Sequence, residues 1–128
     1  KIDAPIGRNK HNRLRMKVAT YGRSAVSLWK VRKRFDKFTL LDIEIKTGRT
    51  HQIRVHTAYI NHPVLGDENY NEGRDNTVAD IKIRNAIAAL GRFFLHAEKL
   101  SFTHPKTHER LEFTQELPTE LKELLDLL

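Results

Sequence analysis

Hydrophobic and polar residues alternate along three stretches near the start of the chain. In residues 12–20, every second side chain from Leu14 to Val18 is apolar, and the side chains between them are basic. A period of two predicts a half-buried strand with a basic outer face. Residues 25–35 and 38–46 repeat the alternation on either side of a two-residue polar link, which predicts an antiparallel hairpin.

The second of these stretches carries its aromatic residues on one side. Trp29, Val31 and Phe35 are expected to share a face, opposite Lys30 and its basic neighbours. Aromatic side chains on an alternating strand usually pack in a core, which is the interpretation we adopt for Trp29 and Phe35. Stacking on nucleic-acid bases is the alternative.

The hydrophobic period lengthens after Gly48, where helices are expected. Thr50 is a suitable N-cap for a helix over 51–61, which Pro63 would end. The residues that follow, 62–76, are rich in Gly, Asp, Asn and Pro and predict an irregular loop.

A second helix is predicted between a loose capping box at residues 77–80 and Gly91. Residues 93–103 and 111–114 then favour strands, and a short final helix follows Pro118. No repeat or linker divides the chain. We therefore expect a single α+β unit over residues 1–128, built on a largely antiparallel or mixed sheet with flanking helices.

Composition supports one folded unit and excludes several classes of protein. The chain has 128 residues, of which 39% are hydrophobic and 30% are charged, so it holds enough apolar material for a core. It contains no Cys, which excludes a disulfide scaffold, a zinc ribbon and a thiol nucleophile. No apolar run approaches the roughly 18 residues of a membrane span, and the N-terminus lacks an apolar signal region. Because Lys1 stands where an initiator Met would, we expect the chain to begin partway through a longer protein.

Basic residues are concentrated at the N-terminal end. Residues 1–37 hold twelve Lys and Arg against two Asp, a local charge of +10. Residues 38–128 hold eleven Lys and Arg against fourteen acids, a charge of −3. This asymmetry favours a binding surface for a polyanion such as RNA, the alternative being a charged face that only confers solubility.

The densest polar stretch runs from Thr47 to His56. A Gly turn leading into a helix N-terminus collects free backbone N–H groups, and Arg49 adds positive charge there, which suits a phosphate or a carboxylate. Arg54, one turn into the helix, can offer a fork of donors to a carboxylate. The alternative is a capped helix whose Arg pairs with a surface acid.

Other candidate groups favour structural roles. His51 and His56 are five residues apart, not the four of a zincin pair, and His104 and His108 bracket a turn without a further ligand, so we expect no metal. Asp67 could be a general base, but in its loop a capping role is the favoured interpretation.

The polar stretch also resembles a known family. Gly48-Arg49-Thr50-His51-Gln52-Ile53-Arg54-Val55-His56, followed by His62-Pro63-Val64-Leu65-Gly66-Asp67 and Tyr70, is similar to a signature of the RluA-type pseudouridine synthases. These enzymes isomerise uridine to pseudouridine in ribosomal or transfer RNA. Further blocks match in order along nearly the whole chain: residues 2–8, 22–27 and 95–97, Leu100, His104-Pro105 and Leu117-Pro118.

Two motifs of that family do not occur in residues 1–128. The catalytic Asp of the family lies in a His-Arg-Leu-Asp motif, and a Tyr that packs on the target base follows it, both upstream of the block at residues 2–8. His11–Arg15 is superficially similar, but Arg15 stands where the Asp would be and the spacing differs. The resemblance therefore implies the C-terminal part of a catalytic domain, and we expect this stretch alone to be inactive.

The resemblance also implies roles for individual residues. Arg54 matches the Arg that pairs with the catalytic Asp, and Arg49 and His51 are expected near the RNA. The residues expected to contact RNA phosphates through the basic N-terminal region are Arg8, Lys10, Arg13, Arg15 and Lys17. The family needs no metal and no organic cofactor.

We accordingly expect a cytoplasmic RNA-modifying isomerase, monomeric in its complete form, without membrane contact, acting on ribosomal RNA or on tRNA. A non-catalytic basic RNA-binding module is the alternative. An α+β interaction domain with incidental charge is a third interpretation.

Overall fold

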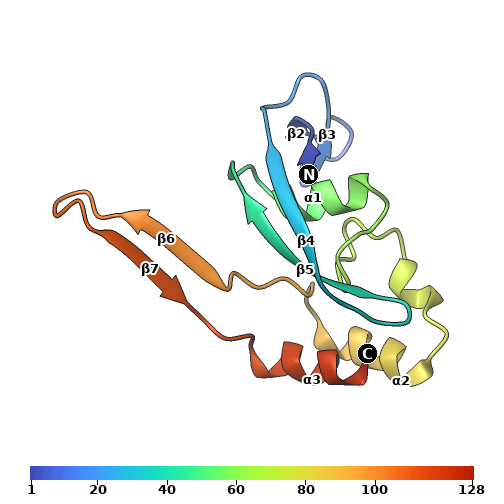
Figure 1. The fold of residues 1–128 in the computed structure, drawn as a ribbon. Helices are drawn as coiled ribbons and strands as arrows, with labels where there is room; N and C mark the ends of the chain where they lie inside the picture. The colour runs from blue at the N-terminus through green and yellow to red at the C-terminus, as the bar shows by residue number, and fades with distance from the viewer.

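The computed structural model describes residues 1–128. Its elements follow the order β1 (Ile2–Asp3), β2 (Ile6–Arg8), β3 (Met16–Val18), β4 (Val26–Arg34), β5 (Thr39–Ile45), α1 (Gln52–Tyr59), the 3₁₀ helix η1 (Arg74–Thr77), α2 (Ile81–Leu90), β6 (Lys99–Thr103), β7 (Arg110–Thr114) and α3 (Thr119–Leu127). All strand pairs are antiparallel, and helices pack beside them (Figure 1), so the predicted α+β class is confirmed.

The largest sheet is built on the predicted hairpin. β4 pairs with β5 along most of its length, and β1 adds a short third strand on the other edge of β4. The turn is closed by a hydrogen bond from Phe35 N–H to Phe38 O of 2.8 Å. The hairpin of residues 25–46 is therefore confirmed.

The expected aromatic face of β4 is only partly realised. A register shift between Val31 and Lys33 interrupts the alternation, because one residue of β4 has no partner on β5. Trp29 lies on the side of the sheet that α1 covers, where it lines a small gap with Ile53 and Ile60, but it remains 42% exposed. The predicted core position of Trp29 is therefore wrong, because the residue is less buried than a core residue would be.

The predicted strand over 12–20 is shorter than its alternation suggested. Only Met16–Val18 forms a strand, paired with β2, and residues 9–15 form a loop. The side chain of Asn9 holds this loop by accepting hydrogen bonds from the N–H groups of His11 and Asn12, at 2.9 and 3.1 Å. Leu14, expected inside, is 84% exposed.

The main core joins the β2–β3 pair to α1. Ile6, Ala25, Val55 and Tyr70 are buried together, with Met16 and its neighbours packed against them. Gly22 permits this close packing, since a Cβ there would lie 2.4 Å from the carbonyl carbon of Ile6. The first helix is therefore fixed against the β2–β3 sheet.

The start of α2 differs from the expectation. Residues 74–77 form η1, and α2 begins at Ile81 with Asp80 as its N-cap, because the Asp80 carboxylate accepts hydrogen bonds from Lys82 N–H and Ile83 N–H at 2.9 and 3.3 Å. The predicted end is confirmed, with Gly91 in the left-handed conformation at φ 65°.

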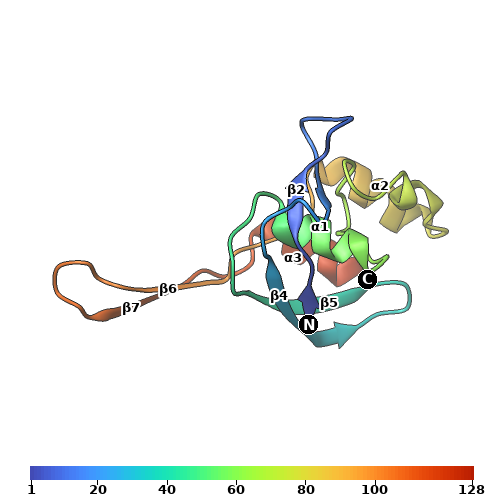
Figure 2. The same cartoon turned by 90° about the horizontal axis from the view of Figure 1, so that it is seen from above.

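The C-terminal part forms a projecting ribbon and a final helix. Of the strand predicted over 93–103, only Lys99–Thr103 is extended; β6 and β7 pair only with each other and reach away from the body (Figures 1 and 2). The predicted helix after Pro118 is confirmed as α3, which packs beside α2 (Figure 1) with Leu121 and Leu124 buried.

Candidate functional site

The first turn of α1 is held by a side chain that sequence analysis did not single out. Thr50 is not the N-cap; His51 occupies that position in the left-handed conformation, at φ 55°, and makes no side-chain capping bond. The Gln52 side chain instead binds the loop that precedes α1. Its Oε1 accepts hydrogen bonds from Arg49 N–H and Thr47 Oγ1 at 3.0 and 2.7 Å. Its Nε2 donates to the carbonyl oxygen of Val26 at 2.9 Å, so α1 is tied to β4.

One helical turn later, His56 continues the same buried network. Its Nε2 lies 2.9 Å from Ala4 O, and because a carbonyl only accepts, this nitrogen carries the proton. Nδ1 then accepts a hydrogen bond from the Ser27 hydroxyl at 2.8 Å. His56 is fully buried, so both ring nitrogens are satisfied and neither is free for a ligand.

Arg54 lies on the opposite side of α1 and forms a buried ion pair. Helical geometry places it about 200° from Gln52 around the axis. Its Nε and Nη2 donate to the two carboxylate oxygens of Asp67 at 2.9 and 2.8 Å, and the side chains are 9% and 1% exposed. The hydrogen bond to Asp67 raises the pKa of Arg54, outweighing the opposing effect of burial. The pair is therefore charged and geometrically fixed.

Two aromatic rings hold the guanidinium of Arg54 in place. Its central carbon lies 4.3 Å from the ring centre of Phe93 and 5.0 Å from that of Tyr70. Gly66, just before Asp67, allows the loop to pack this closely. It adopts φ 79°, and a Cβ there would lie 2.4 Å from Arg92 O.

His51 and Tyr70 form a second polar contact beside Arg54. The Tyr70 hydroxyl accepts a hydrogen bond from Met16 N–H at 3.0 Å and shares a second hydrogen bond with His51 Nδ1 at 2.8 Å. Burial first, and then the nearby Arg54, lower the pKa of His51. This shift favours the neutral ring at pH 7, and Nε2 makes no hydrogen bond within the chain.

The expected RNA-contacting residues occupy several places. Arg8, Lys10, Arg13 and Lys17 are exposed on β2, β3 and the loop between them, whereas Arg15 is half-buried over the Tyr70 ring, 5.0 Å from its centre. Arg8 Nη1 donates to Arg13 O at 2.9 Å. This arrangement brings Arg15, His51 and Arg54 together around Tyr70.

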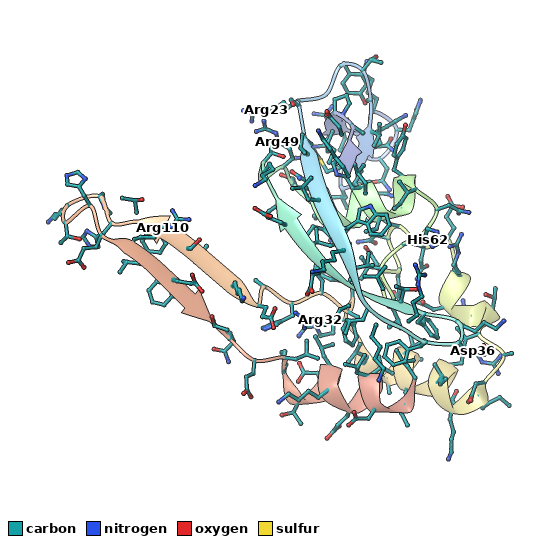
Figure 3. All side chains as sticks on the ribbon, in the orientation of Figure 1. Arg23, Arg32, Asp36, Arg49, His62 and Arg110 are labelled. Carbon is teal, nitrogen blue, oxygen red and sulfur yellow. The ribbon has the colours of Figure 1, made fainter.

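Arg49 lies at a different position. Its Nε donates to Ser24 O at 2.7 Å. Figure 3 places Arg49 next to Arg23, where β4 begins and β5 ends. Arg49 thus extends the positive surface but does not contact the Arg54–Asp67 pair.

Two interpretations of acidic residues require correction. Asp67 does not cap its loop through its side chain, because both oxygens bind Arg54 and the N–H groups of Tyr70 and Asn71 donate to its backbone carbonyl instead. The loop is held by Asp75, whose Oδ2 accepts from Gly66 N–H at 3.1 Å and from Asn71 Nδ2 at 2.6 Å. Burial raises the pKa of Asp75. Likewise, the acid that pairs with Arg54 is buried and not at the surface.

Tyr70 is a site residue that the sequence did not assign, and Asp67, interpreted there as a loop cap with a general base as the alternative, was not assigned as the partner of Arg54. Both belong to the recognised signature. Across the described chain, no three His, Asp or Glu side chains cluster as metal ligands, and no helix has the length and apolar character needed to cross a membrane.

Comparison with known proteins finds that the chain is similar to RNA pseudouridine synthases. Residues 1–59 match the family model described as RNA pseudouridylate synthase. The chain is 40% identical over 129 residues to ribosomal large subunit pseudouridine synthase D of Vibrio parahaemolyticus, and 43% identical over 125 residues to an uncharacterized RNA pseudouridine synthase of Bacillus subtilis. A solved structure of human RNA pseudouridylate synthase domain containing 1 is 25% identical and superposes with a TM-score of 0.71.

These matches cover the chain but only part of each relative. They include 100% of the chain and 40% of the Vibrio protein, 98% of the chain and 37% of the Bacillus protein, and 96% of the chain and 51% of the human chain. The chain therefore spans about two fifths of the length of these bacterial relatives.

Proposed function

Because the chain belongs to the RNA pseudouridylate synthase family, of the RluA type, we propose that it is the C-terminal portion of a catalytic domain that isomerises uridine to pseudouridine in RNA. Ribosomal RNA is the proposed substrate, on the strength of the name of the Vibrio relative. We place the enzyme in the cytoplasm as a monomer. The observation that carries the proposal is the fixed Arg54 guanidinium inside the family signature.

The chemistry explains why such a guanidinium is useful. Pseudouridine formation breaks the bond between the sugar and N1 of uracil, turns the base and joins C5 to the same sugar carbon. A carboxylate that takes part must stay ionised within a cleft, and an adjacent Arg lowers its pKa and fixes its direction. The family's catalytic Asp would come from a segment outside residues 1–128.

Arg54 has a donor left for that second carboxylate. Asp67 occupies Nε and Nη2, and Nη1 makes no hydrogen bond in the structure. In this proposal Asp67 and the two aromatic rings set the position of Arg54, and Nη1 holds the catalytic Asp. Since Arg54 is already fixed, little ordering is required when substrate binds.

His51 and the basic N-terminal residues are proposed to contact RNA. The Nε2 of His51 is free of hydrogen bonds within the chain, and a backbone at φ 55° holds the residue in a conformation that costs about 1–3 kcal/mol for a residue other than glycine. Such strain is typical of functional sites. Arg8 adds positive charge near His51, and Arg49 extends the positive surface toward Arg23.

The direct test follows the hydrogen at C5 of uridine, which the new carbon–carbon bond displaces. RNA labelled with tritium at C5 is incubated with the intact protein and, separately, with residues 1–128 alone. We expect tritium release by the intact protein and none by residues 1–128, because no residue here matches the catalytic Asp. Absence of release by the intact protein would contradict the proposed function, and turnover by residues 1–128 would contradict the assignment of the nucleophile.

RNA affinity should depend steeply on salt through the basic N-terminal residues. If all five contact phosphates, neutralising them together should flatten the log–log salt dependence by about three to five units. The residues to be changed are Arg8, Lys10, Arg13, Arg15 and Lys17. The matched control removes the same charge elsewhere, from Lys82, Lys99, Lys106, Arg110 and Lys122. If the two variants showed the same salt dependence of RNA affinity, the N-terminal residues would act only through the net charge of the protein and would not mark the RNA-contacting surface.

A further inference from the structure

A cavity beside Tyr70 is not used by the proposed roles of Arg54 and Asp67. It lies between β3, the end of α1 and the loop of residues 61–74, and its volume is about 390 Å³. Small-molecule sites are usually clefts of roughly 300–1,000 Å³, so this space can hold a group of nucleotide size. It is distinct from the Arg54–Asp67 pair, because neither of those residues lines it.

The lining of this cavity is positively charged. Arg15, Lys17 and Arg74 line it, with Glu72 as the only acid. Arg74 is held rigidly, since its Nη1 and Nη2 donate to the backbone and side-chain oxygens of Asn61 at 2.8 and 2.7 Å. The cavity therefore presents a net positive charge, and Arg74 needs little reorganisation to meet an anion.

Arg15 brings positive charge to this space. Its guanidinium lies over the Tyr70 ring, and the residue lines the cavity, although its Nε is buried. A phosphate in the cavity would lie near the positive charges of Arg15 and Lys17, and a guanidinium binds phosphate through charge-assisted hydrogen bonds.

An aromatic ring stands at the rim. Tyr59, the last residue of α1, lines the cavity and is 61% exposed. Neither its hydroxyl nor its ring makes a hydrogen bond or an aromatic contact in the structure. An exposed ring beside a phosphate site is the arrangement on which unpaired RNA bases stack.

We propose that this cavity binds one nucleotide of an unpaired RNA segment, with the phosphate at Arg15, Lys17 and Arg74 and the base stacked on Tyr59. The inference rests on the proposed function, to which it adds a binding site for one unpaired nucleotide of the RNA. Unpaired bases are required, because a base within a duplex cannot present its face to Tyr59.

The test measures binding of fluorescein-labelled pentauridylate to the intact protein by fluorescence anisotropy. We expect Tyr59→Ala to weaken binding by about 5-fold to 100-fold, the range for loss of one base–aromatic stack, and Tyr59→Phe to bind like the unchanged protein. Arg15→Ala should also weaken binding. Phe113→Ala, which removes an exposed ring on β7, is the matched control and should have no effect.

An oligomer of five abasic nucleotides separates the base from the phosphate. Tyr59→Ala should leave its affinity unchanged, whereas Arg15→Ala should still reduce it. Pentauridylate binding that is equal for Tyr59→Ala and the unchanged protein would overturn the inference. Tritium release from C5-labelled RNA is measured on the same samples and tests the proposed function separately. Failure of the nucleotide site is thereby distinguished from failure of the proposed RNA modification. Melting temperatures confirm that the exposed substitutions leave the fold intact.

Discussion

Replacing Arg54 with Ala in the intact protein is expected to lower the single-turnover rate of uridine isomerisation by roughly 100-fold to 1,000-fold, the range for loss of one preorganised donor. The catalytic carboxylate would lose its cationic partner, its pKa would rise and its direction would no longer be fixed. RNA affinity should change much less, because Arg54 is 9% exposed and the phosphate-contacting residues lie elsewhere.

Arg54→Lys should fall between Arg54→Ala and the unchanged protein. A lysine keeps the charge but presents one ammonium in place of a planar fork, so it cannot hold both oxygens of Asp67 and a second carboxylate together. The rate and the melting temperature are measured on the same samples. If the folded fraction of Arg54→Ala turned over normally, Arg54 would only tie α1 to the 61–74 loop, and its catalytic role would be wrong.

The sequence was most informative where local chemistry decides the structure. The β4–β5 hairpin follows from strict alternation around a short polar link, and α2 ends at Gly91 because glycine reaches the left-handed region without strain. α3 likewise follows from a Pro start and a leucine face. The helix predicted over 51–61 is observed as α1, and Arg54 lies on it as expected.

The sequence was least informative where residues distant along the chain decide the outcome. Leu14 is exposed because β3 extends only as far as its partner β2 allows, and alternation alone does not give that limit. Thr50 is not the N-cap because Gln52 N–H, which Thr50 would have capped, donates to Arg49 O at 3.0 Å, and the Gln52 side chain is bound to Val26 on β4. Capping rules that use only neighbouring residues do not include such a tertiary contact.

The same limit applies to the candidate site. Arg54 and Asp67 are thirteen residues apart, and no helical or strand period relates them. Their pairing arises because Gly66 turns the loop back against Phe93, a close approach that only the folded chain reveals. Tyr70, which joins Met16, His51 and Arg15, is a second such case.

Asp67→Ala is expected to destabilise the fold by about 3–5 kcal/mol, since it leaves the Arg54 charge buried without its partner. The surface pair of Arg92 and Glu120, at 39% and 51% exposure, provides the matched control. Glu120→Ala should cost about 1 kcal/mol or less, because exposed ion pairs contribute little. Denaturant unfolding of the two variants beside the unchanged protein measures the difference.

The double variant Arg54→Met with Asp67→Leu separates the structural from the catalytic role of the pair. These apolar replacements remove both charges together, so most of the stability lost in Asp67→Ala should return. Isomerisation should remain as low as in Arg54→Ala, because no donor is left for the catalytic carboxylate. Recovery of activity together with stability would mean that the pair serves only the fold, whereas stability regained without activity would establish that Arg54 acts in the reaction.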